Sequence, residues 1–188
     1  TNGLAIGNFA SSGSNQSIAI GYYSVATATE ADPALPATAV GAGANATGQS
    51  TVALGLLAQA TSGSTTALGA KSVASEDAAV AVGYGTKATG NYASALGADA
   101  TASNNDATAF GHGTVASGGS STALGSRAKA GGTAGVGIGM LANATNQYGV
   151  AIGGESSSSA DNSIAIGRKS SVTGESGIAI GAFTTSKG

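Results

Sequence analysis

The sequence predicts an all-β fold, a two-sided parallel β-solenoid built from 14-residue repeats. Two observations support this prediction. A short apolar phrase that ends in glycine recurs along the 188 residues, for example SIAIG at both Ser17–Gly21 and Ser163–Gly167. The 13 closing glycines lie 14 residues apart, except for one interval of 20 between Gly21 and Gly41. A fixed period over a whole chain is typical of stacked units that share a continuous core.

The residues before each closing glycine are expected to form the first strand of each repeat. With that glycine as position 0, position −1 is apolar and position −2 is Ala, except at Gly137. Position −4 is always Gly, Ala, Ser or Thr, and no charge occurs from −4 to 0. Alternating small and large residues without charge predict a strand that is buried on both faces.

The residues after each closing glycine are expected to form a second strand, which is half exposed. Positions +3 and +5 are small apart from Val172, whereas +4 is polar or mixed and +6 is usually Thr or Ser. We therefore place +3 and +5 inside the coil and +4 and +6 in water. Positions +7 to +9 are rich in Gly, Asn, Asp and Ser, the residues that favour turns.

The doubly apolar first strand predicts an oligomer. We place its −3/−1 face inside the coil, which leaves the small residues of the −4/−2 face as an exposed stripe; the sequence leaves the reverse assignment open. An apolar stripe indicates an interface, and a homotrimer around a threefold axis is the simplest closed arrangement. The expected interface residues are Ala19, Ala53, Ala67, Ala81, Ala95, Ala109, Ala123, Ala151 and Ala165, with the turn residues Tyr23, Leu57 and Leu141. An exposed adhesive ridge is the alternative for these large turn residues.

We expect residues 1–188 to form a single repeat-built domain of about 13 coils with one loop insertion at 28–36. Both prolines of the chain, Pro33 and Pro36, lie in this segment. Proline cannot donate to a strand ladder, so the segment must leave the sheet before the register resumes. Insertions of this kind often carry binding residues. The candidates are Glu30, Asp32 and Leu35, with packing of Leu35 on a neighbouring subunit as the alternative.

Composition argues against several classes of function. Lys and Arg number 7 against 9 Asp and Glu, and only 4% of residues are aromatic. A chain without a basic patch or stacking platforms is not expected to bind nucleic acid. Cys is absent and His112 is the one histidine, placed in a predicted turn. Catalysis and metal binding need clusters of such side chains, so we expect no enzyme, no cofactor and no metal site.

The repeat phrase S-[IV]-A-[IL]-G-x-x-[AST] resembles the head repeats of trimeric autotransporter adhesins of the Yersinia adhesin A type. Matching stretches are SIAIGYYS (Ser17–Ser24), TVALGLLA (Thr51–Ala58) and SIAIGRKS (Ser163–Ser170). The resemblance implies a left-handed parallel β-roll, homotrimeric, on the outer membrane surface of a Gram-negative bacterium. It also implies host extracellular matrix or cell-surface proteins as partners. The chain is expected to be an excised head, tied to the membrane only through an anchor domain that it does not contain.

The expected function is therefore that of an adhesin head that attaches the bacterium to host cells or matrix proteins. Basic residues would supply weak contacts that are repeated in each subunit of a trimer. These candidates are Lys71, Lys87, Arg127, Lys129, Arg168 and Lys169. Two alternatives stay open. One is a structural spacer that presents another binding domain. The other is an ice-binding solenoid, which is less favoured because Thr is interrupted by Ser, Gly and Lys at position +6.

Overall fold

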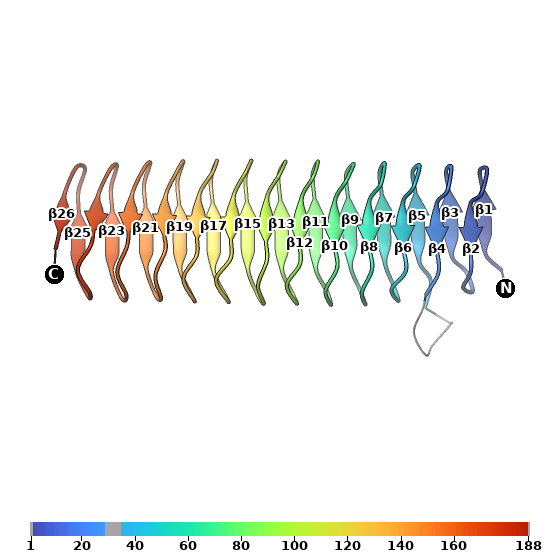
Figure 1. Ribbon diagram of the computed structural model, residues 1–188, viewed down its shortest axis with the longest axis horizontal. Coiled ribbons are helices and arrows are strands. Elements are labelled where there is room, and N and C mark those ends of the chain that lie inside the picture. Colours follow the sequence, from blue (N-terminus) through green and yellow to red (C-terminus); the bar gives the residue numbers. More distant parts are fainter. Residues whose placement is uncertain (1, 29–34, 188) are drawn as a thin grey trace. The chain divides into compact units, whose positions relative to one another are not determined.

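The computed structural model describes residues 2–28 and 35–187, which form a parallel β-solenoid of short strands and tight turns (Figure 1). In this described part, no helix has the length and apolar character needed to span a membrane. The chain divides into two compact units, residues 1–93 and residues 94–188. That 1–188 is one domain stays a prediction.

Each coil gives one three-residue strand to a first sheet, sheet A, and one two-residue strand to a second, sheet B. In the first unit, sheet A contains β1 (Leu4–Ile6), β3 (Ile18–Ile20), β5 (Thr38–Val40), β7 (Val52–Leu54), β9 (Thr66–Leu68) and β11 (Val80–Val82). Sheet B of this unit contains β2 (Ser11–Ser12), β4 (Val25–Ala26), β6 (Asn45–Ala46), β8 (Gln59–Ala60), β10 (Val73–Ala74) and β12 (Lys87–Ala88).

The second unit repeats this arrangement. Its sheet A contains β13 (Ser94–Leu96), β15 (Thr108–Phe110), β17 (Thr122–Leu124), β19 (Val136–Ile138), β21 (Val150–Ile152), β23 (Ile164–Ile166) and β25 (Ile178–Ile180). Its sheet B contains β14 (Thr101–Ala102), β16 (Val115–Ala116), β18 (Lys129–Ala130), β20 (Asn143–Ala144), β22 (Ser157–Ser158), β24 (Ser171–Val172) and β26 (Thr185–Ser186).

Strands of the same sheet pair in parallel, with an offset of one repeat. In the second unit, Ala109 of β15 lies opposite Ala123 of β17. In the first unit, Ile18 of β3 pairs with Thr38 of β5 across the 20-residue interval. The prediction that the register resumes after the insertion is therefore confirmed. Of the loop itself, residues 29–34 lie outside the described residues.

Apart from the insertion at 28–36, the connections between the described strands are four-residue turns whose third residue has a positive φ. In the turn after sheet A, the Ser72 N–H donates to the Gly69 carbonyl at 3.2 Å, and Lys71 has φ 60°. The turn after sheet B has the same form, with Ala78 at φ 53°. This is the pattern of a type II turn. The turns expected at positions +7 to +9 are confirmed.

The closing glycine is required because successive coils approach each other closely there. Gly125 has φ +122°, and a Cβ atom on it would lie 2.8 Å from the carbonyl carbon and oxygen of Gly139 in the next coil. That separation is shorter than van der Waals contact, and the conformation is one that only glycine adopts easily. The repeated glycine is therefore a structural requirement of stacking.

The expected face assignment of the first strand is wrong: the small −4/−2 face lies inside the coil and the large −3/−1 face lies outside. The nine alanines expected at the interface, Ala19, Ala53, Ala67, Ala81, Ala95, Ala109, Ala123, Ala151 and Ala165, are each 0% exposed within a single chain. They cannot contact another subunit. The reason is space, since a Cβ on Gly137, at position −2, would lie 2.4 Å from the Lys129 carbonyl oxygen.

The faces of the second strand agree with the prediction. Position +5 is buried in β12 and β18, while Lys87 and Lys129 at +4 are exposed.

Hydroxyl groups inside the coil form hydrogen bonds with carbonyl groups of the turns. Thr114 Oγ1 at position +3 donates to the Gly111 carbonyl at 2.7 Å, and Ser121 Oγ at −4 donates to the Gly118 carbonyl at 2.7 Å. The hydroxyl groups of these two buried residues therefore pair with the carbonyl groups of the turns.

Candidate interaction surfaces

The outer face of sheet A carries the apolar side chains of position −1, with Ile, Val, Leu, Thr or Ser at position −3, and we call this row the sheet A stripe. In the first unit Leu54 is 41% exposed, and in the second unit Phe110 is 50% exposed. Adjacent strands repeat these side chains one above another, because the strands pair in register. An exposed row of apolar side chains that is repeated from strand to strand indicates an interaction surface.

A second surface follows the turns at positions +1 and +2, and we call it the +1/+2 edge. The three interface candidates on it, Tyr23, Leu57 and Leu141, are each about half exposed in the single chain. In the first unit, the ring of Tyr23 stacks on Phe9 at 4.7 Å and meets Tyr22 edge-on at 4.5 Å between centroids. Such clusters of exposed rings are typical of contact surfaces.

The six basic candidates do not form one site. Lys71, Arg127, Arg168 and Lys169 lie on the +1/+2 edge, whereas Lys87 and Lys129 lie on the outer face of sheet B. Three of those on the edge have partners within their own surface. Lys71 Nζ lies 5.6 Å from the Tyr84 ring centroid, Arg168 lies 4.6 Å from the Phe183 ring, and Lys169 Nζ lies 3.5 Å from Glu155 Oε2.

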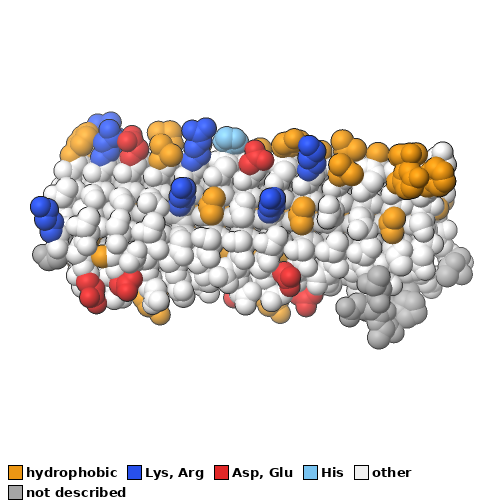
Figure 2. All heavy atoms as spheres, in the orientation of Figure 1, with side chains coloured by type: hydrophobic (Ala, Val, Ile, Leu, Met, Phe, Trp, Pro, Cys, Tyr) orange, Lys and Arg blue, Asp and Glu red, His pale blue; other side chains and the backbone are white. Residues whose placement is uncertain are grey.

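Charge is distributed unequally between the two turn edges. Every Lys and Arg falls between positions +1 and +6, and Figure 2 shows most of them along one edge. Five of the acidic residues occupy positions +7 to +9, on what we call the +8/+9 edge: Glu76, Asp77, Asp106, Asp161 and Glu175. Of the loop candidates, Glu30 and Asp32 lie outside the described residues, and Leu35 is 38% exposed.

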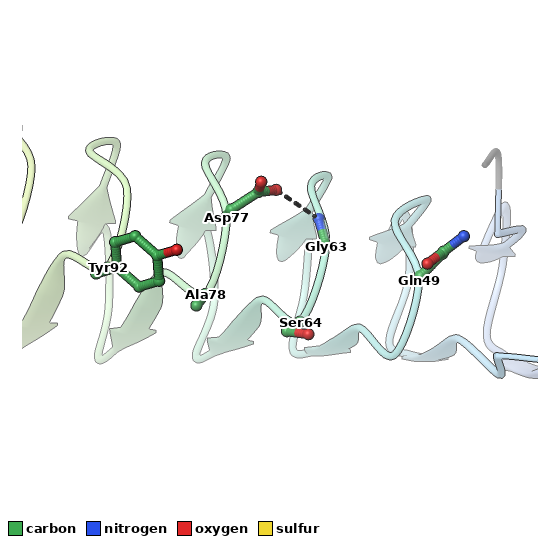
Figure 3. A pocket seen from close by; sticks show the side chains of 6 residues that line it. All are labelled: Gln49, Gly63, Ser64, Asp77, Ala78 and Tyr92. Carbon is green, nitrogen blue, oxygen red and sulfur yellow. Dashed lines mark hydrogen bonds between the residues drawn. The ribbon is translucent and has the colours of Figure 1, made fainter. Parts of the chain in front are cut away.

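A shallow pocket of about 400 Å³ lies on the +8/+9 edge of the first unit. Figure 3 shows that its lining comes from successive coils, with Tyr92, Asp77, Gly63 and Gln49 following one another along the edge. Ser64 and Ala78 complete the lining. The pocket exists because small side chains at position +9 lie beside Tyr92, which is 65% exposed.

Sequence reasoning missed this pocket, although a signal for it was present. Position +9 holds Ser64, Ala78 and Tyr92 in three successive repeats, and Ser120, Ala134 and Tyr148 repeat that order.

His112 is exposed in its turn. Among the described residues, no group of three or more His, Asp or Glu side chains is placed to hold a metal ion.

The family model "YadA head domain repeat (2 copies)" matches residues 1–30, 36–58, 60–86, 88–114, 116–142, 144–170 and 158–184. The comparison with curated proteins gave no significant match. Among solved structures, the chain is similar to the collagen-binding domain of the Yersinia adhesin YadA. The two are 31% identical, with a TM-score of 0.47, and the match covers 89% of this chain and 75% of that chain.

The family matches follow the repeat that shapes the fold. They extend over all the coils described above and include the closing glycines, the buried Ala of position −2 and the small residues of position +3. Because the family model accounts for well over half of the residues, the chain belongs to the YadA head domain repeat family.

Proposed function

We propose that this head attaches a bacterium to host cells or to extracellular matrix proteins. Membership of the YadA head repeat family is the observation that carries the proposal. A binding role, rather than catalysis, is in keeping with that family. As part of an autotransporter passenger, the head would lie outside the cell, and a separate anchor would hold it to the outer membrane.

The head acts as a homotrimer in this proposal, with the sheet A stripe as the subunit interface. The stripe presents large aliphatic side chains such as Leu54 and Leu124, which are 41% and 39% exposed in one chain. A closed threefold arrangement would turn three copies of the stripe toward one another and remove them from water. The +1/+2 and +8/+9 edges and the outer face of sheet B then supply the surfaces for host ligands.

A solid-phase assay tests the adhesive role. Purified head is applied to wells coated with collagen, fibronectin or laminin, and to cultured epithelial cells, with albumin as the control. Collagen is the first ligand to test, because the similar YadA domain is described as collagen-binding. Saturable binding to at least one coating supports the proposal. Absence of binding to all matrix proteins and to cells contradicts it and favours a structural spacer.

A further inference from the structure

The pocket on the +8/+9 edge combines an aromatic ring with a fixed carboxylate. The Tyr92 ring comes from one coil, Asp77 from the coil before it, and Ala78 lies next to Asp77 in the same turn. Backbone groups here are already used by the stacking ladder, because the Tyr92 N–H donates to the Asp77 carbonyl at 2.8 Å and the Ala78 N–H to the Gly63 carbonyl at 2.9 Å. A ligand must therefore be recognised by side chains.

The Asp77 carboxylate is held in place by its neighbours. Its Oδ1 accepts hydrogen bonds from Ser62 Oγ and from the Gly63 N–H, the latter at 3.2 Å. Within the described residues, Oδ2 forms no hydrogen bond. Asp161 in the second unit is held in a similar way by the Gln147 N–H, at 3.1 Å. Anchoring of Oδ1 is thus a feature of the turn stack, whereas a tyrosine in the following coil is particular to Asp77.

From this arrangement we propose that the pocket binds a neutral hexopyranose ring, such as the terminal sugar of a host glycan. The C–H groups on one face of a pyranose carry partial positive charge, and they pack well against the negative face of an aromatic ring. A hydroxyl group on the same sugar ring can donate to Asp77 Oδ2. The Ser64 hydroxyl lies two coils from Tyr92, within reach of a second ring. An aromatic platform with acceptors and donors at its rim matches such a ring.

The size and charge of the pocket define the ligand further. Two coil spacings separate Ser64 from Tyr92, which gives a length of about 10 Å, enough for one or two sugar rings. Glu76 lies beside Asp77 and is exposed, and the chain carries a formal net charge of −2. A negative edge disfavours sialic acids and sulfated sugars. The pocket therefore favours neutral hexoses.

The same lining occurs again 56 residues later, at four times the repeat length. Gly63, Ser64, Ala78 and Tyr92 correspond to identical residues at 119, 120, 134 and 148, and Gln49 corresponds to Asn105. The backbone ladder is also the same, because the Tyr148 N–H donates to the Thr133 carbonyl at 2.9 Å. One position differs: Thr133 stands where the first unit has Asp77. The second site therefore lacks the carboxylate, and we expect it to bind more weakly.

This inference goes beyond the adhesive role proposed above, because it names a ligand class and a site that matrix-protein binding does not require. Saturation-transfer difference NMR is the suitable measurement, since an open pocket covers one face of a ring and millimolar affinity is expected. The probes are methyl β-D-galactopyranoside, methyl α-D-glucopyranoside and methyl α-D-mannopyranoside, with 3′-sialyllactose as the anionic comparison. We expect saturation of the ring protons of at least one neutral glycoside.

Variants on the two edges show whether the saturation-transfer signal arises from the pocket. Y92A should weaken binding by about tenfold or more, Y92F should retain it, and D77T should reduce it to the level of the second site. The matched control is Y84A, an exposed tyrosine on the +1/+2 edge, and this variant should bind as the unchanged chain does. Plates that carry the bound sugar on a glycolipid or on a protein then identify the carrier.

Several results would overturn the inference. They are absence of saturation for every neutral glycoside, stronger saturation of sialyllactose, or a signal that survives the combined Y92A and Y148A changes. Loss of the oligomer in Y92A, measured by light scattering, would show that the tyrosine is a subunit contact instead. A head that binds matrix proteins but no glycoside would remove this site and leave the proposed adhesive function in place.

Discussion

Side chains inside each coil are smaller than those outside it, and this difference decides how individual residues are placed. The core is made of Ala with some Ser, Thr and Gly and one larger residue, Val172, whereas the other large aliphatic residues face outward. Where position +5 is Ser instead of Ala, position −4 of the same coil is Gly. The pairs are Gly3 with Ser12, Gly149 with Ser158 and Gly177 with Ser186. In these three coils the larger residue at +5 is thus offset by the smaller residue at −4.

This offset predicts the effect of a single methyl group. In G149A, the new Cβ would lie 2.7 Å from Ser158 Oγ, so the coil must shift to relieve the clash. We expect a loss of about 1–3 kcal/mol in the free energy of unfolding. Chemical denaturation at fixed protein concentration measures it. Adding S158A should restore most of the loss, because the clashing oxygen is removed. A G149A variant as stable as the original chain would contradict this account of the core.

Sequence alone could predict the strands and turns at this scale but not the facing of the first strand. Both of its faces are apolar, and a preference for large residues in the core favours the wrong choice. The deciding quantity is the distance between the two sheets, which no single residue encodes. One pair of residues points to the correct facing. Val172 stands at position +5, where most repeats have Ala, and Gly177 at position −4 of the next coil leaves space for it. A Cβ on Gly177 would lie 2.7 Å from Val172 Cγ1.

At the scale of the element, one strand has two faces with different roles. In β17 and β18 of the second unit, Ala123 is 0% exposed, Leu124 is 39% exposed and Lys129 points outward from sheet B. We expect A123E to unfold the coil, because an unpaired buried charge costs several kcal/mol. L124E should keep the strand pairing of a single chain but prevent assembly. K129E should change neither property.

Circular dichroism and light scattering separate these three outcomes. Loss of β signal is expected for A123E alone, and loss of the oligomer with retained β signal for L124E alone. If L124E remains an oligomer, the sheet A stripe is not the interface. If K129E behaves like A123E, the outer face of sheet B has been misassigned.

The insertion between β4 and β5 is a second element with a testable role. The strands on both sides of it stay in register, and at its described start the Ala28 N–H donates to Ser14 Oγ at 3.1 Å. Removing residues 30–35 would reduce the 20-residue interval to the common 14. We therefore expect the shortened chain to fold with an unchanged β spectrum and mass. Unfolding of this variant would mean that the loop supports neighbouring coils.

Adhesion of the shortened chain answers a further question. If it folds and still binds the same host coating, the coils carry the binding surface. If it folds and no longer binds, residues 30–35 include the adhesive element. The sequence could predict where this segment leaves the sheet, since both prolines mark it, but not what it contacts.

For the whole molecule, folding and assembly are expected to depend on each other. An interior of Ala and Ser contributes little per coil, since burial of one methylene-sized group stabilises by about 0.8 kcal/mol. The larger aliphatic groups, such as Leu54 and Leu124, lie on the sheet A stripe and can contribute fully only when another copy covers them. In a single chain, the aliphatic side chains that could contribute most to the free energy of unfolding therefore remain exposed to water.

This dependence leads to the last prediction. Light scattering should give about three times the chain mass of 17.4 kDa. The thermal midpoint should rise with protein concentration, because association stabilises the folded state by mass action. L124E provides the control, since its lower midpoint should not change with concentration. A monodisperse single chain whose midpoint is high and independent of concentration would contradict the coupling. It would mean that the alanine core and the strand ladder suffice to hold the coils together, and that the sheet A stripe has another partner.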